Sequence, residues 1–361
     1  MQAEASALKT ASEVVPLAFP RGKDTLCELC QGAARLQCSE CRVTFYCTAE
    51  HQQADWVGIH ERICQLLVPI RTSTLVSLQQ AGHNETELDK VELIEICRSV
   101  AQSKLSEGKH QEALPAAQFC LRCSKDVYGP STVKMVPAYL LLAEANMALG
   151  NLSQVAELLS QAEWAGLKSP EHSAHHQLHR SLGRLHTATG NLEAALFHFA
   201  NDIYFASEEY GLDSTVTCGG FFLMADVFAK QEKIPTARSL FSKVAQTWHC
   251  HLTKLLETHA QNVQNPDMVL EPSYGEARRM LKVMLEFEQN YIRKDSAQIA
   301  LVAYCLAMLW FLGGDSIKAL GFGSTALQAS QLIPNHDLTE PIQGLLQLVQ
   351  SLQMEQHPGS D

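Results

Sequence analysis

The sequence predicts an all-α protein: a small metal-stabilised head followed by an array of paired helices. Two observations lead to this prediction. Cysteine and histidine residues crowd into residues 22–66, and helix-to-helix turns recur at a nearly constant interval beyond them. Hydrophobic residues make up 46% of the 361 positions, which is enough for a packed core. We expect an N-terminal segment at 1–21, the head at 22–66, a connecting helix at 67–84 and the helical array at 85–355.

The head is defined by eight Cys and His residues in four close pairs, Cys27 with Cys30, Cys38 with Cys41, Cys47 with His51, and His60 with Cys64. Zinc takes four such ligands in a closed structural site, so eight ligands predict two zinc ions. The two C-x2-C pairs need tight turns, whereas the i, i+4 spacing of the last two pairs predicts that they lie on short helices. In a head of this size, metal binding and folding should be one event.

These residues resemble the MYND-type zinc finger. The resemblance rests on the two C-x2-C pairs, Tyr46-Cys47, His51-Gln52, Trp56 and the closing His60-x3-Cys64. His51 departs from it, because the family mostly has Cys there. Spacing alone leaves the assignment of ligands to ions open. The resemblance implies a cross-brace, with Cys27, Cys30, Cys47 and His51 at one ion and Cys38, Cys41, His60 and Cys64 at the other.

Some MYND fingers bind short proline-containing peptides through the Gln and Trp of this last helical turn. By resemblance, Gln52 and Trp56 are candidate peptide-contact residues. The alternative is that Trp56 packs against the zinc core or the following helix.

Four similar turns, centred on Gly108, Gly150, Gly190 and Glu232, follow at steps of 42, 40 and 42 residues. Such a period predicts a stack of helix pairs. Glycine suits the left-handed end of a first helix, and Asn151 and Asn191 suit the N-cap of a second. A small or apolar residue stands five positions after each turn, where the helices should cross closely: Ala113, Val155, Ala195 and Ala237.

The series resembles tetratricopeptide repeats in the longer form of kinesin-light-chain-like arrays. The resemblance implies a solenoid whose first helices face a partner protein, around 139–146, 175–184 and 221–228. We expect His176 and Arg180, one turn apart, to contact that partner. The stripe that contains His176 also has the spacing of a metal site, but a polar helix face explains it better. Cys120 and Cys123 lack a second pair and are interpreted as core thiols.

Charge and hydropathy exclude several classes of partner. The net charge of −11 gives no general field for nucleic acid. The longest uncharged apolar run, Ile299–Leu312, has 14 residues and predicts a buried helix, because a membrane span needs about 20. The N-terminal residues lack the apolar stretch of a secretory signal, so we expect the reducing cytoplasm. The expected partners are therefore proteins, not nucleic acid or a membrane.

No phosphate-binding, dinucleotide-binding, hydrolase-elbow or zinc-protease motif occurs in the sequence, and no enzyme is expected. The order of domains resembles MYND proteins with repeats that are associated with cilia and sperm flagella. That resemblance implies a non-enzymatic scaffold of the axoneme with tetratricopeptide or dynein-related partners. One alternative is a nuclear corepressor adaptor, which the lack of a basic cluster disfavours. Another is a lysine methyltransferase relative, for whose SET domain residues 66–102 leave no room.

Overall fold

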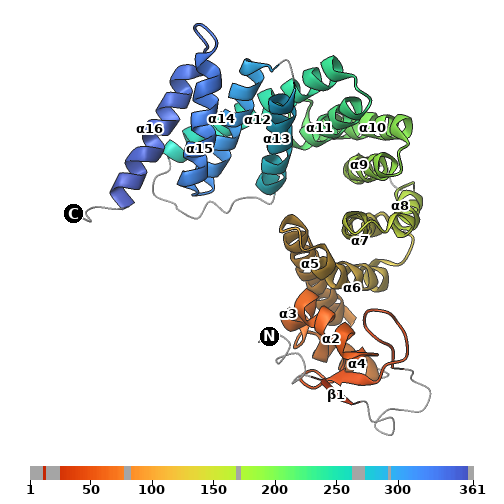
Figure 1. The fold of residues 1–361 in the computed structure, drawn as a ribbon. Coiled ribbons are helices and arrows are strands. Elements are labelled where there is room, and N and C mark those ends of the chain that lie inside the picture. Colours follow the sequence, from red (N-terminus) through yellow and green to blue (C-terminus); the bar gives the residue numbers. More distant parts are fainter. Residues whose placement is uncertain are drawn as a thin grey trace. The chain divides into compact units, whose positions relative to one another are not determined.

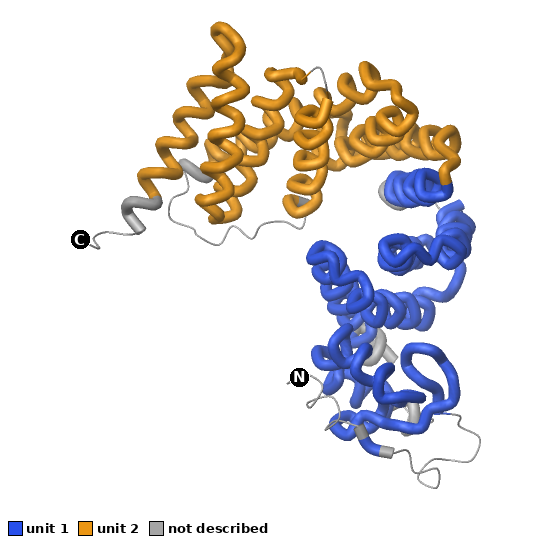
Figure 2. Tube along the Cα trace, viewed as in Figure 1, with its two compact units in different colours: residues 1–189 blue, residues 190–361 orange. Residues whose placement is uncertain are grey.

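The computed structural model of the chain describes residues 11–13, 25–76, 83–167, 172–261, 273–291 and 294–356. The chain divides into two compact units, Met1–Thr189 and Gly190–Asp361, which Figure 2 colours separately. Most of the expected N-terminal segment 1–21 and part of the expected connecting helix 67–84 lie outside the described residues. The head and the first helix pairs therefore belong to the same unit.

The head contains a small antiparallel sheet, to which residues 11–13 of the expected N-terminal segment add a strand, and it ends in a helical segment. Its strands lie in the order β1 (Ala11–Glu13), β2 (Leu36–Cys38) and β3 (Phe45–Tyr46). The register places Ala11 opposite Cys38 and Leu36 opposite Tyr46. The helical segment runs through α2 (Ala49–Asp55), a single π turn, η3 (Trp56–His60), and α3 (Glu61–Ile63). Cys38 ends β2, Cys47 follows β3, and His51 and His60 lie in the helical segment, so these elements position the metal-ligand residues.

Each C-x2-C pair closes a tight turn of the same shape. Gln31 follows the first pair with a φ of 58°, and its N–H donates to the carbonyl of Cys27 over 3.0 Å. Arg42 follows the second pair with a φ of 57°, and its N–H donates to the carbonyl of Cys38 over 3.1 Å. The left-handed residue reverses the chain so that both sulfurs of a pair point to one side. The expected knuckles are therefore present.

The helices of unit 1 beyond the head pack on their neighbours in sequence (Figure 1). They are α4 (Leu67–Val76), α5 (His83–Ser106), α6 (His110–Tyr128), the 3-10 turn η4 (Val133–Met135), α7 (Val136–Ala148), α8 (Leu152–Gly166) and α9 (His172–Ala188). One hydrophobic cluster runs from Ile59 and Ile63 of the head through Leu67 of α4 to Leu93 of α5 and Phe119 of α6. The end of the finger thus contributes to the core of the helical array.

Unit 2 consists of helices in its described part. They are α10 (Leu192–Tyr210), α11 (Thr215–Lys230), α12 (Ile234–Gln261), α13 (Ser273–Asn290), α14 (Ser296–Leu312), α15 (Ser316–Gln331) and α16 (Thr339–Gln356). Helix α14 lies against α12, α13 and α15 (Figure 1). Its residues from Gln298 to Leu309 are almost all buried. This helix contains the apolar run Ile299–Leu312, so the prediction of a buried helix is confirmed.

The turns at Gly150 and Gly190 have the left-handed geometry that their sequences predict, and the other two turns share it. Gly108, Gly150 and Gly190 have φ values of 77°, 77° and 82°, and Glu232 takes the same left-handed region with a φ of 60°. The four residues five positions later are fully buried, each with 0% exposure: Ala113, Val155, Ala195 and Ala237. Small residues at these positions let the paired helices approach closely.

One cap differs from the expectation. The side chain of Asn191 accepts from the N–H of Ala194, as an N-cap should. The side chain of Asn151 does not cap α8. Instead its Nδ2 donates to Oδ1 of Asn146 over 3.1 Å, because Asn146 lies buried at the end of α7 within its reach.

The described residues contain no strand beyond Tyr46. The fold class, a small zinc-finger head followed by an all-α helical array, is confirmed. Among the described residues, no helix combines the length and the apolar character that crossing a bilayer requires.

Candidate metal centre

Two Cys3His groups lie in the head. One consists of Cys27, Cys30, Cys47 and His51, and the other of Cys38, Cys41, His60 and Cys64. Within each group all ligand atoms lie within 4.8 Å of one another. These are the sets that the resemblance to a cross-brace implies, and each takes one pair from a knuckle and one pair from the segment around α2 to α3.

The first group lies at the surface of the head. Cys30 is exposed, Cys47 and His51 are half-buried, and Cys27 is buried. His51 presents its Nδ1 atom, 3.1 Å from the sulfur of Cys47 and 3.5 Å from that of Cys27. Tetrahedral zinc with Zn–S bonds of about 2.3 Å places neighbouring ligand atoms about 3.5–4 Å apart. The distance from Nδ1 of His51 to Cys27 matches this edge and that to Cys47 is shorter, so His51 offers its ring nitrogen as a ligand where the family mostly has Cys.

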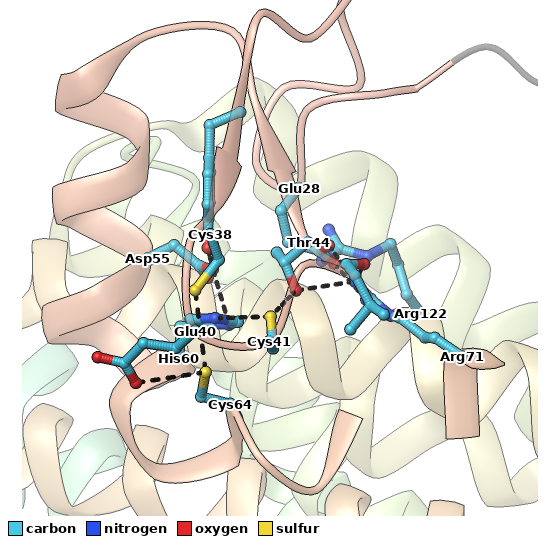
Figure 3. Close-up of polar contacts among 12 residues, drawn as sticks. Glu28, Cys38, Glu40, Cys41, Thr44, Asp55, His60, Cys64, Arg71 and Arg122 are labelled. Carbon is cyan, nitrogen blue, oxygen red and sulfur yellow. Dashed lines mark hydrogen bonds and ion pairs between the residues drawn. The ribbon is translucent and has the colours of Figure 1, made fainter. Parts of the chain in front are cut away.

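The second group is fully buried. The sulfurs of Cys38 and Cys64 lie 3.9 Å apart, and Nε2 of His60 lies 3.6 Å from the sulfur of Cys41 (Figure 3). Both distances match the edges of a zinc tetrahedron. The two groups differ mainly in access, since solvent reaches the first and not the second.

A buried carboxylate lies behind the second group. Oδ2 of Asp55 is 3.7 Å from Nδ1 of His60, the ring atom that does not face the cysteines. The hydroxyl of Tyr46 donates to the same oxygen over 2.8 Å. Burial raises the pKa of Asp55 to about 6, although His60 and the Tyr46 hydroxyl oppose this shift. A carboxylate on Nδ1 favours the tautomer in which Nε2 is free to bind a metal.

The three cysteines of the second group need a nearby cation if all of them are to be ionised. Hydrogen bonding from Cys38, with help from His60 and Thr44, lowers the pKa of Cys41 to about 3 against the effect of burial. Cys41 in turn raises the pKa of Cys38, and burial raises the pKa of Cys64 to about 11. Without a metal, one thiolate suppresses ionisation of its neighbours. Zinc supplies the positive charge that holds all three sulfurs as thiolates, and two bound zinc ions are the cofactors of this head.

The expectation that Cys47 lies on a helix is wrong. Helix α2 begins at Ala49, and Thr48 is its N-cap, with its hydroxyl oxygen accepting from the N–H of His51 over 3.3 Å. Cys47 therefore precedes the helix, directly after β3. The i, i+4 spacing cannot separate one helical turn from a capped helix start, since both bring residues 47 and 51 close together.

A buried ion-pair network fastens the finger to the helices (Figure 3). Both carboxylate oxygens of Glu28 accept from Arg71 of α4, over 2.9 and 3.1 Å, and Oε1 also accepts from Arg122 of α6 over 2.6 Å. These guanidiniums lower the pKa of Glu28, although burial alone would raise it. Arg71 also donates to the hydroxyl of Thr44, which is hydrogen-bonded to the sulfur of Cys41. The network therefore extends to a metal ligand.

The two candidate peptide-contact residues of the finger, Gln52 and Trp56, differ in how far they are exposed to solvent. Gln52 is only 1% exposed, because its position in α2 turns it into the head, and its peptide contact stays a prediction. Trp56 is half-buried, packs against the zinc core and lies 5.7 Å from the ring of His60, centroid to centroid. The second interpretation of Trp56, packing at the zinc core, is thus the one that its contacts favour.

His176 is not on an exposed face of α9. It is 2% exposed, and Leu178, two positions on, is also buried. Arg180 is half-buried. The expectation of a surface pair is wrong for His176, because histidine is polar enough to suggest solvent yet small and apolar enough to fill a helix interface. Cys120 is buried as expected, whereas Cys123 is half-buried.

Residues 27–64 match the MYND finger family, so a MYND finger is present in the chain. Among solved structures, the chain is similar to BtubC (BKLC) from P. vanneervenii at 14% identity, over 67% of this chain and 92% of that one, with a TM-score of 0.32. So loose a likeness identifies neither a fold family nor a function. The finger itself is a zinc-binding module of the protein-interaction class and not a catalytic one.

Proposed function

We propose that this chain is a non-enzymatic adaptor that joins other proteins, and that it is a component of the axoneme of cilia or sperm flagella. The expected partners are axonemal tetratricopeptide or dynein-related proteins, met in the cytoplasm or in the axoneme. The zinc finger supports the adaptor role, since MYND fingers are protein-interaction modules. The axonemal part rests on the resemblance of the domain order.

One observation carries the proposal most directly: finger and helices share a core. Ile59 and Ile63 of the finger lie in the same hydrophobic cluster as Leu93 and Phe119 of the array, and Glu28 is paired to Arg71 and Arg122. A finger held in this way is a fixed part of the helical surface. A rigid composite surface suits a structural assembly, because little conformational entropy is lost when it binds.

The chemistry of the described residues supports a non-enzymatic role. Each Cys3His group already offers four protein ligands, so it leaves no open position at which a zinc-bound water would react. The described parts of residues 66–102 lie in α4 and α5, which supports the view that no SET domain is inserted there. A methyltransferase is therefore not proposed.

Proximity labelling with the full chain in ciliated cells tests the proposal. We expect labelled proteins to come from purified axonemes, and chromatin-bound corepressors to be labelled no more than by a free labelling enzyme. A Cys38→Ser variant, which removes a ligand of the buried zinc group, is the matched control and should lose the axonemal signal. Labelling concentrated on chromatin would replace the axonemal proposal with the nuclear corepressor adaptor.

A further inference from the structure

A cavity of about 340 Å³ lies where the finger is fastened to the helices. Residues of α4, α5 and α6 line it, all within unit 1. Its apolar lining comes from Leu67, Ile70, Leu93 and Phe119, whose side chains otherwise belong to the hydrophobic core. Ligand pockets in proteins start at roughly 300 Å³, so the volume is sufficient for a small ligand group.

The polar lining of this cavity is strongly basic. Arg71, Lys90, Arg122 and Lys125 contribute four positive charges, and Asp126 contributes the only negative charge among the lining residues. Glu28, behind the lining, pairs with both arginines and offsets one further charge, so the site keeps a net positive charge. The chain has a net charge of −11, so the cavity is a positively charged site in a negatively charged protein. Apolar walls strengthen such a field, because they keep high-dielectric water away from the charges.

Some of the basic groups are held in place by an ion pair, and others make no ion pair within the described part of the chain. Glu28 and the ring of Phe119 position the guanidiniums of Arg71 and Arg122, which lie 5.7 and 5.5 Å from that ring. Within the described part of the chain, Arg122 makes one ion pair, to Glu28, through a single nitrogen. The structure describes no ion pair for the ammonium of Lys90 or of Lys125, and that of Lys125 lies 5.7 Å from the centroid of the Tyr139 ring. Pre-positioned donors with spare capacity suit an acceptor that comes from outside.

The lining of the cavity offers two kinds of contact, one apolar and one basic. An apolar side chain and a neighbouring carboxylate fit these contacts, one on the lining of Leu93 and Phe119 and the other against the basic groups.

We propose that this cavity binds a short acidic segment of a partner protein, in which a carboxylate lies next to an apolar anchor residue. The inference deepens the proposed adaptor function and rests on it. A protein segment is favoured over a free anion, because inorganic phosphate gains nothing from the apolar lining. It is favoured over nucleic acid, because the net charge of −11 repels a long polyanion outside the cavity.

A peptide selection tests the inference on the full-length, zinc-loaded chain. A display library of random short peptides is selected on the wild type, and the best binder is synthesised. The same peptide is made with Gln in place of each Glu and Asn in place of each Asp. Affinities are measured by fluorescence anisotropy against the wild type and against a Lys90→Glu/Lys125→Glu variant. Neither lysine pairs with Glu28, so this variant leaves the fastening of the finger unchanged.

A second variant controls for net charge. Lys254→Glu/Lys282→Glu changes the charge by the same amount at exposed positions of α12 and α13, outside the cavity. We expect selected peptides to carry acidic and apolar neighbours. Their affinity should fall about tenfold or more with Lys90→Glu/Lys125→Glu, and also with the amide peptide, but not with the control. Equal zinc content and melting temperature of the three proteins complete the expected result.

Three results would overturn the inference: no enrichment of acidic peptides, equal binding to both variants, or competition of the binder by inorganic phosphate alone. The proposed adaptor function is judged separately. If the Lys90→Glu/Lys125→Glu variant still labels axonemal proteins in cells, the adaptor role stands and the cavity is not its binding site. If the wild type labels none, the adaptor function itself fails.

Discussion

At the scale of single residues, the buried zinc group depends on side chains that do not bind the metal. Asp55 lies between the hydroxyl of Tyr46 and Nδ1 of His60, and all three are almost completely buried. A carboxylate behind a metal-binding histidine orients the ring and raises the basicity of the ligand nitrogen. Asp55 is therefore a positioning residue for the second zinc ion.

Replacing this carboxylate should weaken one zinc site only. We expect Asp55→Asn to lower the affinity of the buried group about 10–100-fold, because loss of such an outer partner has that effect in other zinc sites. Competition with a chromophoric chelator measures it, and native mass spectrometry counts the ions that remain. Tyr46→Phe is the matched control: it removes the hydrogen bond, keeps the carboxylate, and should have a smaller effect. Unchanged affinity in Asp55→Asn would show that His60 needs no orienting group.

A second residue-scale prediction concerns the fourth repeating turn. Glu232 has a φ of 60°, in the region that glycine occupies at the other three turns. A side chain in the left-handed region raises the free energy of the folded state by about 1–2 kcal/mol. Glycine removes this strain but loses more conformational entropy on folding, which offsets about 0.5–1 kcal/mol. Glu232→Gly should therefore stabilise unit 2 by about 0.5–1 kcal/mol. Urea denaturation of the full chain measures the change. A decrease in stability would mean that Glu232 is not strained.

At the scale of elements, the ends of helices and one close contact between them determine the packing. Glycine ends the first helix at three of the turns, and a fully buried Ala or Val follows each of them five positions later. The π turn η3 approaches α6 so closely that a Cβ on Gly58 would lie 2.6 Å from Cγ of Pro115 and 3.2 Å from the carbonyl oxygen of Glu112. Neither a proline ring nor a backbone carbonyl moves easily.

Gly58→Ala should therefore separate the finger from α6. We expect a loss of about 1–3 kcal/mol in unfolding free energy, the usual cost of overpacking. Gly344→Ala in α16 is the matched control, because a Cβ there meets nothing within 4 Å. The control should gain up to about 1 kcal/mol from better helix propensity. Thermal unfolding compares the two, and equal melting temperatures would contradict the close contact.

Gly190→Val makes the opposite change to Glu232→Gly, because it adds a side chain at a turn that has glycine. Gly190 has a φ of 82°, and a Cβ there would meet nothing within 4 Å, so backbone strain is the only cost. We expect a loss of about 1–3 kcal/mol, because a β-branched residue is strained in the left-handed region. Denaturant titration gives the value. No loss would show that the turn can change its conformation.

At the scale of the whole molecule, the stability of the finger and the stability of the first helices depend on each other. The surface zinc group includes the exposed Cys30, whereas the buried group includes Cys64, which directly follows Ile63 of the shared core. Unit 2 has a separate hydrophobic cluster around Phe241, Leu281 and Leu309. Loss of zinc should therefore affect one unit and not the other.

We expect a chelator to remove zinc in two kinetic phases, the first from the exposed group and the second from the buried one. Hydrogen exchange should rise in α4 to α6 with the second phase, because the core around Leu67 and Phe119 loses its metal-held end. Exchange in α14, inside unit 2, is the internal control and should not change. One phase, or equal exchange in both units, would contradict this coupling.

The sequence by itself determined the elements whose cause is local. The spacing of Cys and His predicted two zinc ions, and the recurring glycines predicted the left-handed turns at 150 and 190, because a metal tetrahedron and a positive φ each restrict residue types within a short stretch. Tertiary structure alone decided what depends on distant parts of the chain. The ion pair of Glu28 with Arg122 joins residues that are 94 positions apart in the sequence. The close approach of Gly58 to Pro115 likewise brings η3 against the distant helix α6. His176 and Gln52 became buried for the same reason: a polar residue type predicts exposure only until packing places a neighbouring helix or core over it.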